Sequence, residues 1–122
     1  MNRLVPRIAA LLVGIEHVYI LVLEMFFWNK PLGLRTFGRT QELADATVVL
    51  AANQGLYNGF LAAGLFWGVF TRNRTFVIFF LACVIVAGVF GGITAAPKIF
   101  FTQAVPAIVA LALVLWFDKK ST

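Results

Sequence analysis

Four long apolar runs make up most of this chain, and each is long enough to cross a lipid bilayer as a helix. A bilayer core of about 30 Å needs about 20 apolar residues per helix. Because unpaired backbone groups cannot lie in lipid, continuous apolar runs of this length should be α-helices. A β-barrel would need shorter segments, of about 10 residues, with alternating polarity. The runs cover about residues 4–27, 44–70, 76–96 and 99–117.

The composition agrees with a membrane protein. Of the 122 residues, 61% are hydrophobic and only 12% are charged, whereas soluble domains contain roughly 25% charged residues. We therefore predict an all-α integral membrane protein, an antiparallel bundle of four transmembrane helices that forms one domain over residues 1–122. The lone Cys83 lies inside the third run, so no disulfide framework is expected.

The basic residues lie at the ends of the runs and in the turns between them, as is usual around spanning helices. The net charge of +5 therefore does not indicate nucleic-acid binding. The side that holds both termini and the 71–75 turn is the more basic one, which predicts a multi-pass protein of the cell membrane with both termini in the cytoplasm. That side has Arg3, Arg7, Arg72, Arg74, Lys119 and Lys120, and the opposite side has Lys30, Arg35, Arg39 and Lys98.

The first run carries three ionisable side chains, Glu16, His17 and Glu24. A charge at the centre of a bilayer costs at least about 2.5–3.5 kcal/mol, so an ionisable residue in a spanning helix suggests a functional site. His17 and Glu24 are seven positions apart, which places them within roughly 20° of one face and two turns apart. Glu16 lies about 100° to one side of that face.

The second run carries four polar side chains within six residues: Asn53, Gln54, Tyr57 and Asn58. Together with Thr94 in the third run and Gln103 in the fourth, they lie at or outside the bilayer centre when each run is centred in the membrane at about 1.5 Å per residue. We therefore predict a polar pocket that opens outward beneath the loop at 29–43. Its predicted ligand and proton site comprises Glu16, His17, Glu24, Asn53, Gln54, Tyr57, Asn58, Thr94 and Gln103.

The loop at 29–43 contains Pro31, Gly33 and Gly38, which should interrupt any helix, and it could serve either as a lid or as a plain connector. Thr40 is the expected N-cap of the helix that follows. The short polar turn at 71–75 should fold the second and third runs into an antiparallel hairpin.

Small residues recur at intervals of four in two of the runs, and this spacing lets helices approach closely. In the second run the pairs are Gly55 with Gly59 and Gly64 with Gly68, for which packing is the preferred explanation. In the third run Gly88 and Gly92 are predicted to meet the second run. The turn at 95–98 then leads to Pro106, which frees a carbonyl group near Gln103.

Several stretches together resemble the membrane-protein family of bacteria and fungi named domain of unknown function 1304. The resemblance covers essentially the whole chain, and its most specific part is the block at 51–60. It implies a small four-helix membrane protein and supplies no activity. The matching stretches are Glu16-His17, the residues at 23–26, the block at 51–60, the residues at 91–94, Gln103 and Pro106-Ala107.

Three functional hypotheses fit these residues. The first is binding or transport of a small, partly polar molecule, with Glu16 or Glu24 as a proton-coupled carboxyl group; a chain this short would then need to form a homodimer to make a pathway. The second is a membrane enzyme that uses His17 and a glutamate as acid and base on a lipid-like substrate. The third is a structural membrane subunit. No metal or cofactor is predicted, because one His and no Cys pair is a poor zinc signature. The expected partners are the lipid bilayer and the small molecule.

Overall fold

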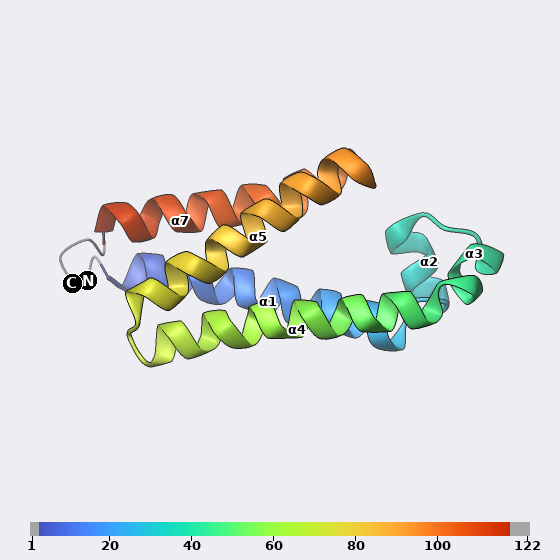
Figure 1. Ribbon diagram of the computed structural model, residues 1–122, viewed down its shortest axis with the longest axis horizontal. Helices are drawn as coiled ribbons and strands as arrows, with labels where there is room; N and C mark the ends of the chain where they lie inside the picture. Colours follow the sequence, from blue (N-terminus) through green and yellow to red (C-terminus); the bar gives the residue numbers. More distant parts are fainter. Residues whose placement is uncertain (1–2, 118–122) are drawn as a thin grey trace. The chain divides into compact units, whose positions relative to one another are not determined.

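The protein is described by a computed structural model covering residues 3–117, and within these residues it is helical and has no β-strand (Figure 1). Within these residues four helices, α1, α4, α5 and α7, have 13 residues or more, and the other elements are short. The elements are α1 (Leu4–Phe26), α2 (Pro31–Phe37), α3 (Gln41–Ala46), α4 (Val48–Phe70), α5 (Arg74–Thr94), α6 (Pro97–Ile99), the π-helical turn η1 (Phe100–Ala104) and α7 (Val105–Phe117).

Among the described residues, three helical segments are long and apolar enough to span a membrane: Leu4–Phe26, Arg74–Thr94 and Pro97–Phe117. They coincide with the first, third and fourth predicted runs. The helix α4 has 23 residues, as many as α1, but Asn53, Gln54 and Asn58 lower the hydropathy of its first half. The membrane class is therefore confirmed, while the fourth span stays a prediction.

The segment predicted as a loop at 29–43 contains helical structure, so that expectation was wrong. Pro31 occupies the first turn of α2, where its missing N–H costs nothing. Gly38 then ends α2 with a left-handed backbone, at φ 65°. The predicted cap is confirmed, because Thr40 Oγ1 accepts a hydrogen bond from Leu43 N at 3.2 Å. The predicted run at 44–70 is also interrupted, since α3 ends at Ala46 and α4 begins after Thr47.

The described chain divides into two compact units, one formed by residues up to Ile15 and from Leu61 onward, the other by Glu16–Phe60. We refer to them as unit 1 and unit 2. The basic residues Lys119 and Lys120, which entered the topology prediction, lie outside the described residues. The assignment of one domain stays a prediction.

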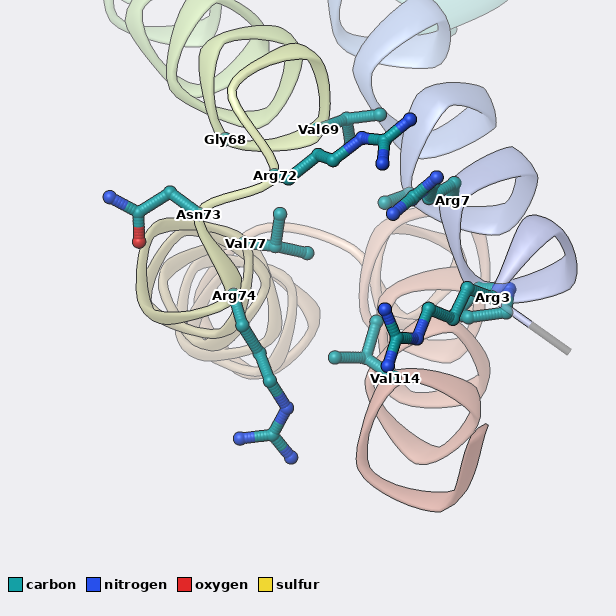
Figure 2. Close-up of a pocket in the computed structure, with 11 residues that line it drawn as sticks. Arg3, Arg7, Gly68, Val69, Arg72, Asn73, Arg74, Val77 and Val114 are labelled. Atoms are coloured by element: carbon teal, nitrogen blue, oxygen red, sulfur yellow. The ribbon is translucent and has the colours of Figure 1, made fainter. Parts of the chain in front are cut away.

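In unit 1 the polar turn joins α4 and α5 as an antiparallel hairpin, as the sequence predicted. Asn73 caps α5, because its side chain accepts a hydrogen bond from Phe76 N at 3.1 Å. A Cβ on Gly68 would lie 2.9 Å from Val77 Cγ2, so the helices approach closely beside the turn (Figure 2). About one turn before Gly68 in α4, Gly64 faces the ring of Phe80. These contacts confirm packing as the role of the Gly64–Gly68 pair.

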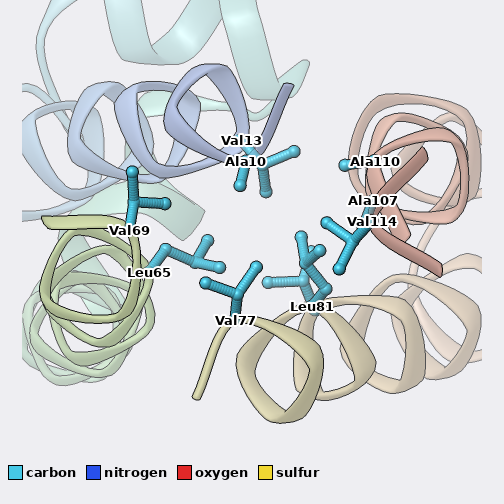
Figure 3. Close-up of a cluster of buried hydrophobic side chains, with 10 residues drawn as sticks. Ala10, Val13, Leu65, Val69, Val77, Leu81, Ala107, Ala110 and Val114 are labelled. Atoms are coloured by element: carbon cyan, nitrogen blue, oxygen red, sulfur yellow. The ribbon is translucent and has the colours of Figure 1, made fainter. Parts of the chain in front are cut away.

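Apolar side chains from α1, α4, α5 and α7 converge on the core of unit 1 (Figure 3). Leu65 and Leu81 are its largest fully buried members. Burying a leucine side chain contributes about 1.5–3 kcal/mol. The core comprises Ala10, Val13, Leu65, Val69, Val77, Leu81, Val84, Ala107, Ala110 and Val114.

The predicted contact of the glycines in α5 with the second run was wrong. A Cβ on Gly88 would lie 2.5 Å from Ala104 N, and one on Gly92 would lie 2.7 Å from Phe100 Cβ. The connection after α5 is short, so the last turns of α5 must pack against the segment that follows. The earlier part of α5, with Val77 and Phe80, is the part that faces α4.

The π-helical turn η1 lies directly before Pro106. At its end Val105 N donates to Phe100 O, five residues earlier, instead of the usual four. Proline has no N–H to continue the regular pattern and clashes with the preceding turn. The wide turn is therefore the local adjustment that lets the segment from Pro97 to Phe117 remain continuous.

Candidate functional site

A short hydrogen bond in unit 2 joins Glu24 on α1 to Asn58 on α4. Asn58 Nδ2 donates a hydrogen bond to Glu24 Oε1 at 2.6 Å. Asn58 is only 7% exposed, and Glu24 is partly buried. Hydrogen bonds to an ionised group are the stronger ones, and removing one partner leaves the other unpaired at a cost of about 1–3 kcal/mol.

Two glycines of α4 make this contact reachable. A Cβ on Gly55 would lie 2.6 Å from Met25 Cγ and 3.2 Å from Glu24 Cβ, and one on Gly59 would lie 2.7 Å from Leu21 Cδ1. Larger residues at these positions would hold α1 and α4 apart. The glycine spacing in the second run therefore places the Asn58 amide within reach of the carboxylate.

The segment after α1 packs around Trp28. Its indole Nε1 donates to Thr47 Oγ1 at 3.0 Å, and the ring of Phe37 lies 4.8 Å away between centroids. These residues belong to a small apolar cluster built on three buried residues, Trp28, Ala44 and Ala51, with Leu34, Phe37 and Val48 against them. In Figure 1, α2 and α3 lie at the end of unit 2 where α1 finishes and α4 begins.

Arg39 brings a positive charge to this end of unit 2. Its guanidinium carbon lies 4.7 Å from the centre of the Trp28 ring, within the range of a cation–π contact. The segment after α1 thus places a cation beside the aromatic cluster at Trp28.

A second polar network, on the outer surface of unit 2, holds the segment after Trp28. Asp45 Oδ1 accepts hydrogen bonds from Asn29 Nδ2 at 3.0 Å and from Gln41 Nε2 at 2.9 Å. Gln41 Nε2 also donates to the carbonyl oxygen of Asn29 at 2.9 Å. The two side-chain hydrogen bonds hold the pKa of the Asp45 carboxyl below its ordinary value.

The other predicted site residues of α1, Glu16 and His17, lie next to each other. His17 is fully buried, and its Nδ1 lies 4.0 Å from Glu16 Oε1. Within residues 3–117 no hydrogen-bond partner reaches that Glu16 oxygen. The seven-residue interval puts His17 about 10 Å from Glu24 along the helix axis, on the same face.

The predicted residues of the second run divide by exposure. Asn53 is exposed and donates to the backbone oxygen of Val49 at 2.9 Å, and Tyr57 is 57% exposed. Gln54 is also exposed, so Asn58 is the buried one of the four.

The predicted residues of unit 1 have local contacts. Thr94 Oγ1 donates to Phe90 O at 2.7 Å, and Gln103 is partly buried in η1. A pocket that includes all nine predicted residues stays a prediction. The described residues contain no group of three or more His, Cys, Asp or Glu side chains placed to hold a metal ion.

Sequence reasoning missed Arg39, Trp28 and Thr47 as parts of this site. Arg39 entered only the count of basic residues. The contacts among these three join residues 11 and 19 positions apart through non-periodic segments. The signal that the sequence offers is the partly apolar composition of the 29–43 segment, which contains Leu32, Leu34 and Phe37.

Comparison with known proteins gives one family and one curated relative. A family model described as "Protein of unknown function (DUF1304)" matches residues 11–115. The chain is 34% identical over 108 residues to "Uncharacterized protein YpaA" of Lactococcus lactis subsp. lactis (strain IL1403), an alignment that covers 85% of this chain and 91% of the relative. No solved structure matches the chain.

Proposed function

We infer a function from the site itself, because the chain belongs to the family described as "Protein of unknown function (DUF1304)", whose description assigns no activity. This membership confirms the resemblance seen in the sequence. The proposed function is binding or transport of a small, partly polar molecule, with Glu24 as the carboxyl group that binds the molecule or a proton. The observation that carries the proposal is the 2.6 Å hydrogen bond from Asn58 Nδ2 to Glu24 Oε1.

A carboxylate in an apolar helix needs a compensating partner, because an unpaired buried charge is costly. Asn58 supplies one hydrogen bond, and one amide does not neutralise the charge. A proton on the carboxyl group, or a positively polarised group of a ligand, would complete the compensation. Ligand and proton would then compete for the same oxygen atoms, which makes binding depend on pH.

Arg39 and Trp28 indicate what chemistry such a ligand has. Arg39 already holds a cation over the Trp28 ring. Arg39 is itself exposed. A small amine with an apolar body could place its amino group at Glu24 and its apolar part against the indole. We therefore propose small amphipathic amines as the first ligands to test.

The remaining parts of the proposal concern architecture. The membrane arrangement is four spanning helices, with α4 as the fourth, both termini in the cytoplasm and two copies forming a pathway. The residues Glu16, His17, Asn53, Gln54, Tyr57, Thr94 and Gln103 extend the polar site in this arrangement.

The alternative of an acid–base enzyme receives no comparable support. The His17 side chain is 0% exposed, and its Nδ1 lies 4.0 Å from Glu16 Oε1, beyond hydrogen-bond distance. A general base must reach the proton that it abstracts, directly or through one water. We therefore retain ligand binding as the proposed function.

The proposal is tested by labelling the protein in liposomes with dicyclohexylcarbodiimide, which adds to a protonated carboxyl group and leaves a stable N-acylurea. Peptide mapping by mass spectrometry should find the adduct on Glu24. A tertiary amphipathic amine such as N,N-dimethylbenzylamine, which cannot form an amide with the activated carboxyl group, should reduce the yield of the adduct. The variant Glu24→Gln should lose this adduct. Glu42→Gln, which changes an exposed carboxyl of α3, should keep it. An unlabelled Glu24, or a yield that no amine in a broad panel reduces, would contradict the proposal.

A further inference from the structure

Unit 1 contains a cavity of about 170 Å³ at the end where α1 and α5 begin and where α4 and α7 finish. Four arginines line it (Figure 2). Arg3 directly precedes α1 and Arg7 lies in its first turns, whereas Arg72 lies in the turn after α4 and Arg74 is the first residue of α5. In Figure 2 the side chains of Arg3, Arg7 and Arg72 lie around one space, while the side chain of Arg74 extends away from it. The remaining lining residues are Pro6, Ala10, Gly68, Val69, Asn73, Val77 and Val114.

Within residues 3–117, no carboxylate side chain lines this cavity. None of the eleven lining residues is Asp or Glu. The sequence also has no Asp or Glu at positions 3–15 or 61–117, which are the described parts of unit 1. Asp118 lies outside the described residues. The Nε of Arg74 is buried and has no hydrogen-bond partner within residues 3–117.

Arginines in this number match a phosphoryl group. The guanidinium presents a planar fork of N–H donors that fits phosphate oxygens with two parallel hydrogen bonds. Two long helices, α1 and α5, also begin at the cavity, and their free N–H groups and dipoles favour negative charge. Charge and donor geometry therefore favour an anion with several oxygens over a simple halide ion.

The volume of the cavity and its apolar lining limit which anions fit it. A volume of about 170 Å³ is below the roughly 300–1,000 Å³ of pockets for drug-sized molecules. It holds about five or six water volumes of about 30 Å³ each, which is enough for a phosphoryl group and its first substituent. The floor is apolar, with Val69, Val77 and Val114, so carbon atoms attached to the phosphoryl group would lie against it.

We propose that this cavity binds a phosphoryl anion, supplied either by the headgroup of an anionic lipid or by free phosphate. Neither Glu24 nor Asn58 is among the residues that line this cavity. Basic pockets between spanning helices are known to hold lipid headgroups. The cavity lies at the ends of three segments that are long and apolar enough to span a membrane, which is the depth of lipid phosphate.

The test measures binding to the purified full-length protein in a neutral detergent, with native mass spectrometry for lipids and thermal unfolding for inorganic phosphate. The probes are phosphatidylglycerol, phosphatidylcholine, and sodium phosphate against sodium chloride at equal ionic strength. Binding of phosphatidylglycerol in clear preference to phosphatidylcholine assigns the site to a lipid headgroup. Stabilisation by phosphate but not by chloride, without a lipid preference, assigns it to free phosphate.

Variants connect the binding to the cavity. The double variant Arg7→Gln/Arg72→Gln should weaken binding by about tenfold or more for each arginine, because each removes charge-assisted hydrogen bonds. The control Arg35→Gln removes an exposed arginine of α2 and should bind like the wild type. The milder variant Arg72→Lys keeps the positive charge but loses the planar guanidinium. Its affinity should fall between that of the double variant and that of Arg35→Gln.

Three results would overturn the proposal. The first is equal affinity for the two lipids together with equal effects of phosphate and chloride. The second is wild-type affinity in the folded double variant. If the double variant does not fold, Arg72→Lys is compared with Arg35→Gln instead. Equal affinity of these two variants is the third result that would overturn the proposal.

Discussion

Gly88 offers a sharp test of the packing in unit 1. It is buried in α5 and faces the π-helical turn. A Cβ at this position would lie 2.5 Å from Ala104 N, 2.8 Å from Ala104 Cβ and 2.9 Å from Ala104 Cα. Two of these atoms belong to the backbone, which cannot rotate away. The variant Gly88→Ala must therefore push α5 and η1 apart.

The magnitude follows from two opposing effects. Overpacking of a well-packed core typically costs about 1–3 kcal/mol. Replacing glycine by alanine inside a helix returns about 1 kcal/mol through helix propensity. We therefore expect Gly88→Ala to lower the free energy of unfolding by about 1 kcal/mol, within a range of about 0–2 kcal/mol.

Gly91 provides the matched control in the same helix. A Cβ there would lie 2.9 Å from Ile99 Cγ2, and the next two atoms are side-chain atoms at 3.7 Å. A side chain can adjust at a cost of about 0.5–1.5 kcal/mol, which the gain in helix propensity roughly cancels. Gly91→Ala should therefore have nearly the stability of the wild type.

The assay is reversible unfolding in mixed micelles with increasing sodium dodecyl sulfate, followed by circular dichroism. Gly88→Ala should be less stable than Gly91→Ala by about 1–2 kcal/mol. The comparison between the two variants removes the shared gain in helix propensity. If Gly88→Ala is as stable as Gly91→Ala or more so, the close approach of α5 to η1 is not the contact described.

Three further predictions concern other parts of the chain. Thr47→Val removes the acceptor of the nearly buried Trp28 N–H and should lower the free energy of unfolding in the same assay by about 1–3 kcal/mol, whereas wild-type stability would refute that role. The pKa of Asp45 is lowered from an ordinary value of 3.8, so its stabilising contribution is complete above about pH 4 and is lost as the pH falls through the lower folded value. Asp45→Asn should therefore unfold in acid with a weaker dependence on pH, and an unchanged acid transition would refute this. Reporters active only in the cytoplasm should give a signal when fused to either terminus. A signal from only one terminus would mean that the number of spanning helices is odd, which contradicts four.

The sequence predicted the helical segments well where apolar length alone decides them. The first, third and fourth runs became α1, α5 and the segment from Pro97 to Phe117, because lipid leaves a long apolar run no alternative to helix. The prediction failed at 29–43, where Pro31 was interpreted as a helix breaker and in fact begins α2. A proline can begin a helix or end one, and only the residues around it in space decide which.

The partners of the small residues could not be predicted from spacing. The interval between Gly88 and Gly92 shows that α5 has a small-residue face but not which segment packs there. The contact with Ala104 depends on the short connection before η1 and on the wide turn itself. In α4, by contrast, Gly64 and Gly68 pack across the polar turn, and the turn is visible in the sequence.

The candidate site was predictable as a set of residue types and not as a set of contacts. Glu24 and Asn58 each stand out, because a polar group in an apolar run needs a reason. Their hydrogen bond also depends on the close approach at Gly55, which brings α4 against Glu24. The cation over Trp28 depends on how α2 folds back, and no periodicity in the sequence encodes that fold.

The most direct test of the Glu24 site is infrared difference spectroscopy of the protein in liposomes, recorded while the pH is changed. A protonated carboxyl group hydrogen-bonded to an amide gives a C=O band that appears as the proton binds. We expect a titrating band in the wild type that is absent in Glu24→Gln, is shifted in Asn58→Leu, and changes when an amphipathic amine binds. A spectrum of Glu24→Gln identical to that of the wild type would show that Glu24 does not exchange protons, and would contradict the proposed function.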